Sequence, residues 1–165
     1  MRMRGFDSIR AKAVLAMALP SFILGATSCG DTDPATPAAC LGGPSGFREA
    51  LVDAPGPVRL EGEVAISDCL PRNQGVGPQE SVGRSLLLVA GGLARQRDRG
   101  DGAETAALRD GYLVGAVRRA AGDSEGIHSA LVDRITSAAG SGLGREPAQV
   151  RQAYERGLAA GLENG

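Results

Sequence analysis

Apolar residues recur at helical spacing through most of the second half of the chain, and this pattern restricts the fold more than any other feature. In the segment 78–97, four of them lie three or four residues apart, on one face of a helix: Val82, Leu86, Val89 and Leu93. Similar repeats predict three more long helices and a short one: 103–122, 123–140, 146–163 and 45–54. Their short connections favour an all-α fold, a four- to five-helix bundle.

The segment 103–122 carries a line of small residues four apart: Ala107, Gly111 and Gly115. A glycine inside a helix costs about 1 kcal/mol relative to alanine, and close approach of a neighbouring helix would offset that cost. In membranes this spacing marks helix dimers, but the charged residues of this segment exclude a membrane span. Tight packing in a bundle is therefore expected, and a cavity beside the glycines is the alternative.

Three local expectations concern the loops and helix ends. The charge run 95–102 is predicted to be a solvated loop, and Asp123 or Ser124 is predicted to cap the helix that follows. In the segment 55–73, apolar residues alternate around Glu61-Gly62, which is consistent with a small hairpin or with an irregular loop. The sequence leaves these last two possibilities open.

The N-terminus has the three parts of a secretory signal peptide. Residues 1–12 are basic, residues 13–25 are apolar apart from Ser21, and residues 26–28 are small. The alternative is an uncleaved membrane anchor, but a spanning helix needs about 20 apolar residues and this run is shorter and contains a proline. We therefore expect residues 1–28 to be a signal peptide.

The residues that end this segment, Thr27-Ser28-Cys29, resemble the lipobox of bacterial lipoproteins, with Ala26 where that motif usually has leucine. The resemblance covers the signal peptide alone. It implies cleavage before Cys29, attachment of diacylglycerol to its sulfur, and anchoring to the outer face of the cell membrane. The alternative is ordinary signal cleavage, which would leave a secreted protein with a free thiol.

The cysteine count agrees with lipidation. The chain has three cysteines, and an odd cysteine in an exported protein needs an explanation. If Cys29 is lipidated, then Cys40 and Cys69 remain to form a disulfide in an oxidising compartment. Such a bond would stabilise the fold by roughly 3.6 kcal/mol in the chain-entropy estimate. Two free thiols are the alternative.

Composition excludes several kinds of chemistry. The part after residue 28 has no lysine and no methionine, which excludes Schiff-base catalysis, a Walker-type phosphate loop and thioether metal ligands. One histidine and few aromatic residues give no expectation of a metal site, a cofactor or nucleic-acid binding. We expect a lipidated Cys29 with a flexible tether over 29–39 and a single helical domain over 40–165.

Four residues are candidates for a binding site. His128 could act as a base, a ligand or a pH-sensitive group, but a boundary histidine with a polar partner is the simpler interpretation. Arg118 and Arg119, near Tyr112, could bind a carboxylate or phosphate, or could only complement the dipole of their helix. No catalytic residues are predicted.

These features predict a lipid-anchored, extracytoplasmic helical domain that acts as a binding module, with the membrane and an envelope protein as partners. One alternative is a carrier of small molecules or lipids with a cavity inside the bundle. Another is a hydrolase centred on His128, which would need acidic or hydroxyl groups beside the ring.

Overall fold

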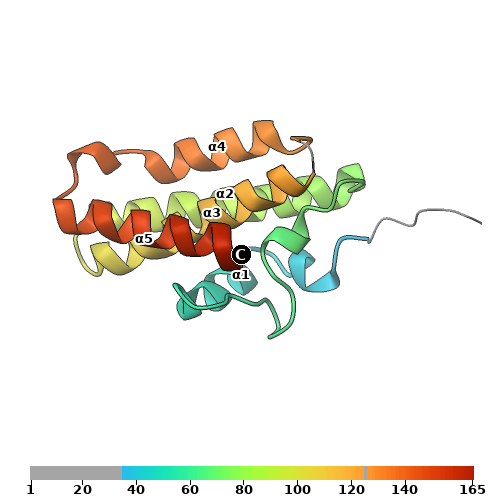
Figure 1. The fold of residues 1–165 in the computed structure, drawn as a ribbon, viewed down its shortest axis with the longest axis horizontal. Helices are drawn as coiled ribbons and strands as arrows, with labels where there is room; N and C mark the ends of the chain where they lie inside the picture. The colour runs from blue at the N-terminus through green and yellow to red at the C-terminus, as the bar shows by residue number, and fades with distance from the viewer. Residues whose placement is uncertain (1–34, 125) are drawn as a thin grey trace, which may run out of the picture. The chain divides into compact units, whose positions relative to one another are not determined.

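The computed structural model describes residues 35–124 and 126–165. The α-helices (Figure 1) are α1 Pro44–Ala50, α2 Val76–Asp98, α3 Ala103–Asp123, α4 Ser129–Gly140 and α5 Ala148–Asn164. Short connections join the helices from α2 to α5, whereas residues 51–75 separate α1 from α2. Single 3-10 turns lie at η1 Ala38–Leu41, η2 Leu51–Asp53, η3 Ser67–Cys69 and η4 Leu143–Arg145. No strand occurs within the described residues, and the predicted all-α bundle is confirmed.

The predicted signal peptide and lipidated Cys29 lie outside the described residues. Of the predicted tether, only residues 35–39 are described, and Ala38 and Ala39 belong to η1.

Helix α3 is the centre of the bundle. It contacts α2, α4 and α5, while α1 packs against α2. In Figure 1, α4 runs along one side of the other long helices, and α1 with its adjoining turns lies on the other side. Almost all of the middle of α3 is buried as a result, including Leu113, Val114 and Val117.

Helices α3 and α5 are in contact through their backbones. A Cβ atom on Gly111 or Gly115 would overlap the carbonyl oxygen of Tyr154 or Leu158. Residue numbers rise together along the two helices, so they run parallel. The facing glycines of α5 are equally confined, because Cβ atoms there would overlap carbonyl oxygens of α3. The expectation of tight packing is confirmed, and the alternative of a cavity beside these glycines is wrong, because the backbone of α5 fills that space.

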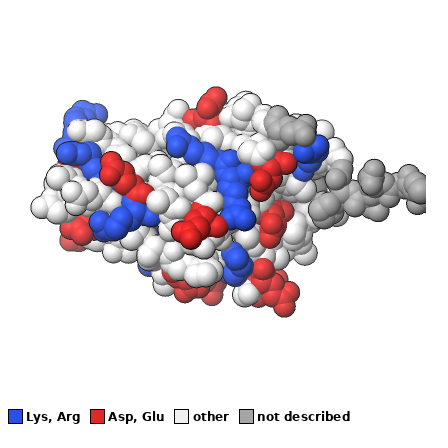
Figure 2. Space-filling view, in the orientation of Figure 1, with Lys and Arg blue, Asp and Glu red and all other residues white. Residues whose placement is uncertain are grey.

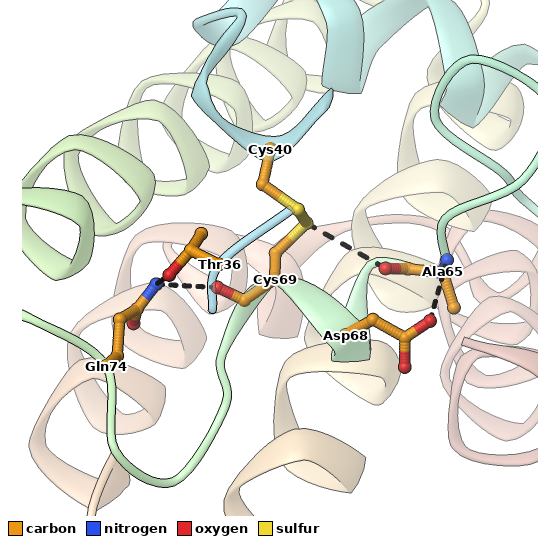
Figure 3. Close-up of a disulfide and its surroundings, with 6 residues drawn as sticks. All are labelled: Thr36, Cys40, Ala65, Asp68, Cys69 and Gln74. Carbon is orange, nitrogen blue, oxygen red and sulfur yellow. Dashed lines mark hydrogen bonds between the residues drawn. A yellow bond between two sulfur atoms is a disulfide. The ribbon is translucent and has the colours of Figure 1, made fainter. Parts of the chain in front are cut away.

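A disulfide holds the N-terminal segment together. Cys40 and Cys69 are bonded, as predicted, with 5.5 Å between their Cα atoms, and the bond joins η1 to η3. Gln74 strengthens the same junction, since its Nε2 donates to the Cys69 carbonyl (2.8 Å) and to Thr36 Oγ1 (2.9 Å). Figure 3 shows the amide nitrogen of Gln74 with a dashed line to each of these two partners.

The segment 55–73 is an irregular loop with one antiparallel bridge, between Leu60 and Val64. Glu61 and Gly62 turn the chain between these two residues with positive φ angles of 51° and 81°, and no further residues pair beyond the bridge in this segment. Of the two alternatives left open by the sequence, the structure has the loop.

The same loop fastens the C-terminal end of α5. Arg59 donates to the Asn164 carbonyl (3.0 Å) and Ser67 Oγ donates to that of Gly165 (2.7 Å). Residues distant in sequence therefore close the bundle at the end of α5.

The start of α4 differs from the predicted one. Helix α3 continues to Asp123, and Ser124 Oγ donates back to Ala121 of α3 instead of capping the next helix. Gly126 then turns the chain with φ +81°, and α4 begins at Ser129 with His128 in the N-cap position. The prediction that Asp123 or Ser124 caps this helix is wrong because both residues complete α3.

We expect Gly157→Ala to lower the free energy of unfolding by about 3 kcal/mol or more, because its Cβ would overlap the backbone of α3 at Leu108. Gly92→Ala is the matched control, since a Cβ at Gly92 meets nothing within 4 Å and the change should add about 1 kcal/mol of helix propensity. Urea denaturation of both variants measures the difference. Equal effects from the two substitutions would contradict backbone contact as the cause.

Candidate functional site

The candidate residues of α3 do not form one site. Tyr112 is buried, and its hydroxyl accepts a hydrogen bond from the backbone N–H of Val58 (3.1 Å), so it fastens the loop to the bundle. Arg118 and Arg119 are exposed, and Arg119 donates to the carbonyl of Glu163 near the end of α5. Tyr112 thus faces the interior, while the two arginines face solvent.

His128 is 1 % exposed and lies at the start of α4. Its Nε2 lies 3.1 Å from the Pro71 carbonyl, and its Nδ1 lies 3.5 Å from Nε2 of Gln79. The neutral ring protonated on Nε2 satisfies both contacts, since a carbonyl only accepts and an amide nitrogen only donates. These contacts provide neither an acid nor a hydroxyl group, which the hydrolase alternative requires. His128 links α4 to α2 and to the loop before it.

A groove with a volume of about 660 Å³ lies between α2 and α4. We call it the α2–α4 groove. Side chains of both helices line it. The apolar ones are Val76, Leu87, Leu88, Ala130 and Leu131, and the polar ones are Gln79, Glu80, Arg84 and Arg134. Two of the apolar residues are strongly exposed, Val76 by 82 % and Leu88 by 50 %. The groove therefore combines apolar walls with two arginines.

The groove exists because α2 has two apolar faces. Leu86 and Val89 face the core, whereas Val76, Gly83 and Leu87 lie on a second stripe at the same helical spacing. Helix α4 covers this second stripe only partly, since Ile135 and Ala139 are its buried residues. An apolar stripe on a helix is usually covered by a neighbouring element, and here the second stripe of α2 stays partly open.

A second feature is a group of buried charges between the helices, which we call the Arg97 cluster: Arg97, Asp110 and Glu146. The side chains of Arg97 and Asp110 are fully buried and form an ion pair of 3.3 Å. Nε of Arg97 lies 3.6 Å from Oε1 of Glu146.

The same guanidinium also ends α4. Its Nη1 donates to the carbonyl of Ala139 (2.9 Å), and its Nη2 donates to that of Ser141. Arginine is well suited to the final carbonyls of a helix because it supplies several donors and a positive charge. One side chain of α2 thereby fixes the end of α4.

Burial raises the pKa of Asp110 from 3.8 to about 7, and the neighbouring Arg97 partly offsets this effect. Oδ1 of Asp110 has no hydrogen-bond partner, so only Oδ2, which accepts from Arg97, has its loss of water contacts offset by a hydrogen bond. Burial, followed by the negative charge of Asp110, also raises the pKa of Tyr154. The Arg97 cluster therefore contains a carboxyl group that titrates near neutral pH.

The sequence-based prediction missed this cluster, and placed Arg97 in a solvated loop. That expectation is wrong because α2 continues to Asp98 and keeps Arg97 in the core. The positions of the two residues could have indicated their burial. Arg97 lies four residues after Leu93, and Asp110 lies three residues before Leu113, so each is in line with the apolar residues of its helix. A charge in the core position of a helix indicates a buried partner.

No protein-family model matches this chain, and neither the curated proteins nor the solved structures include a match. Within the described residues, no helix is long and apolar enough to cross a membrane. No group of three or more acidic, histidine or cysteine side chains there has the arrangement of a metal site. On the face shown in Figure 2, basic and acidic side chains are interspersed, without a large patch of one sign.

The raised pKa of Asp110 predicts a pH dependence of stability. The folded carboxyl binds its proton more tightly than the unfolded one, so its contribution is fully present below about pH 4 and is lost as the pH rises towards 7. Asp110→Asn cannot titrate, and we expect the stability of the native chain relative to this variant to fall across that window. Urea denaturation at several pH values measures it.

Asp101→Asn is the control, because it removes the charge of an exposed carboxyl group. A difference between the native chain and Asp110→Asn that stays constant from about pH 4 to 7 would contradict the assignment to Asp110.

Proposed function

We propose that this chain is an exported, lipid-anchored helical domain that acts by binding another component of the cell envelope through the α2–α4 groove. The observation that carries the binding role is the exposure of Val76 and Leu88 beside a hollow with apolar walls. Exposed apolar surface around a groove is typical of binding sites. The residues of the Arg97 cluster, by contrast, are largely taken up by contacts within the bundle.

Two features support export. Residues 1–28 have the pattern of a signal peptide that ends just before Cys29, and the other two cysteines form a disulfide. Structural disulfides are typical of proteins in oxidising compartments. Because Cys40 and Cys69 pair with each other, Cys29 is left without a partner in the chain, as lipidation of its sulfur requires.

The two alternative functions have less support. A carrier would need an apolar cavity, but the glycines that were expected to leave one are in contact with the facing helix. A hydrolase centred on His128 would need catalytic partners, but the ring contacts an amide and a carbonyl group. The α2–α4 groove, by contrast, has the size and apolar character of a binding site.

The lipid anchor predicts that Cys29→Ser abolishes both the diacylglyceryl adduct and membrane association of the mature chain. The reason is that thioether attachment needs the sulfur of Cys29. Mass spectrometry of the N-terminal peptide and partition into membranes measure these effects. The paired variant Cys40→Ser with Cys69→Ser is the control, since it should keep the adduct. An unmodified Cys29 thiol in membrane material would contradict the anchor.

The binding role predicts covalent adducts from the groove in intact cells. A photoreactive residue in place of Leu88 should form adducts on illumination, because this side chain borders the groove. The same residue in place of Val52, which is 57 % exposed in η2, is the matched control and should form none. Equal yields at the two positions would contradict binding at the groove.

A further inference from the structure

The segment that carries the proposed lipid enters the domain beside the mouth of the α2–α4 groove. Thr36 is held by a hydrogen bond from Gln74, and Gln74 precedes the first residue of α2, Val76, by two positions. Val76 lines the groove and is 82 % exposed. The position where the chain joins the domain is therefore close in the fold to the most exposed apolar side chain of the groove.

The connection is short. Thr36 lies only seven positions after Cys29, and seven fully extended residues span at most about 25 Å. This step rests on the proposed function, because it takes Cys29 as the lipidated residue. A lipid in the bilayer would then keep Thr36 within that distance of the membrane surface, and the groove that begins at Val76 would face the bilayer at a high effective concentration.

The side chains around the groove suit such a surface. Val76 and Leu88 lie along α2, and Ile127, 53 % exposed, precedes His128, whose ring contacts Gln79 of the groove. Apolar side chains of this kind enter the boundary between headgroups and acyl chains when a helix lies on a membrane.

The charges of the groove agree with phospholipid headgroups. Arg84 and Arg134 line it, and the one acid in the lining, Glu80, is paired with Arg84 at 2.6 Å. Arginine side chains can lay their apolar stems along such a surface while the guanidinium reaches phosphate. Two arginines against one glutamate leave the lining a net charge of +1 beside exposed apolar groups, which is compatible with an anionic bilayer.

We propose that the α2–α4 face docks on the phospholipid bilayer in which Cys29 is anchored. Val76, Leu88 and Ile127 enter the interface, and Arg84 with Arg134 contacts headgroup phosphates. The lipid supplies one attachment and this face supplies the second, and stable membrane binding generally takes two such signals. Docking would also orient the domain, with α1 and η2 on the side away from the membrane, since they lie across the bundle from α4 in Figure 1.

The test uses the full lipidated chain, reconstituted in vesicles of phosphatidylglycerol and phosphatidylcholine. A fluorophore is attached to Val76→Cys or Leu88→Cys, with Val52→Cys as the matched control. Labelling is specific because the native cysteines are in the disulfide or lipidated. We expect quenching by doxyl lipids to be several-fold stronger at positions 76 and 88 than at position 52.

Charge reversal gives a second measurement. Arg84→Glu combined with Arg134→Glu should reduce the quenching at position 88 several-fold in vesicles with phosphatidylglycerol. Arg156→Glu, an exposed arginine of α5, is the control and should leave it unchanged. Equal reduction by both would overturn the contact between the groove arginines and phosphate.

Three results would overturn the proposal and separate it from the anchor itself. With the lipid adduct present by mass spectrometry, equal quenching at positions 52 and 88 would mean that this face does not dock. Quenching between labels on different chains, without doxyl lipid, would identify a second copy as the occupant. Adducts at position 88 that contain protein instead of lipid would identify a protein as the occupant of this face. That result would overturn docking on the bilayer but would leave the proposed binding role of the groove intact. Absence of the lipid adduct would remove both the anchor and the docking.

Discussion

The backbone contact between α3 and α5 is the interaction on which the rest of the structure depends. Glycines on each helix leave space for backbone carbonyls of the other helix where Cβ atoms would otherwise lie. Each glycine lowers helix propensity, so these helices rely on one another for stability. The contact also positions the C-terminal end of α5 in space. The carbonyls of Asn164 and Gly165 there accept hydrogen bonds from Arg59 and Ser67 of the N-terminal loop. A local steric fit therefore positions segments distant in sequence.

The Arg97 cluster holds α4 against the bundle through buried charges and hydrogen bonds instead of backbone contact. Breaking a buried ion pair generally costs about 3–5 kcal/mol, whereas replacing both partners by apolar groups can cost nothing. The net contribution of Arg97 and Asp110 to stability is thus smaller than their burial suggests. Their effect is one of geometry, since Arg97 binds Asp110 on α3 and the carbonyls at the C-terminal end of α4. Glu146, just before α5, joins the same cluster.

The helices and the disulfide could be predicted from sequence because each depends on local spacing or on a simple count. Apolar periodicity gave the long helices, and three cysteines left Cys40 and Cys69 to pair. The end of α3 was harder, since Ser124 has the side chain of a cap and only Gly126, with its positive φ, shows where the chain turns. The groove and the buried charges needed the packed structure, because periodicity shows which residues share a face but not which faces remain uncovered.

The groove is a consequence of how the other helices pack around α3. Since α3 is enclosed by α2, α4 and α5, little of its apolar surface remains for solvent, and α4 is left to cover the outer stripe of α2 with few buried residues of its own. A tightly packed centre and a partly covered edge are thus two results of one arrangement. Exposed apolar side chains lower solubility in a freely diffusing domain, but close to a bilayer the same side chains have a surface to contact. The position of Thr36 beside Gln74 places the proposed anchor next to this edge, which makes the uncovered face consistent with attachment at Cys29.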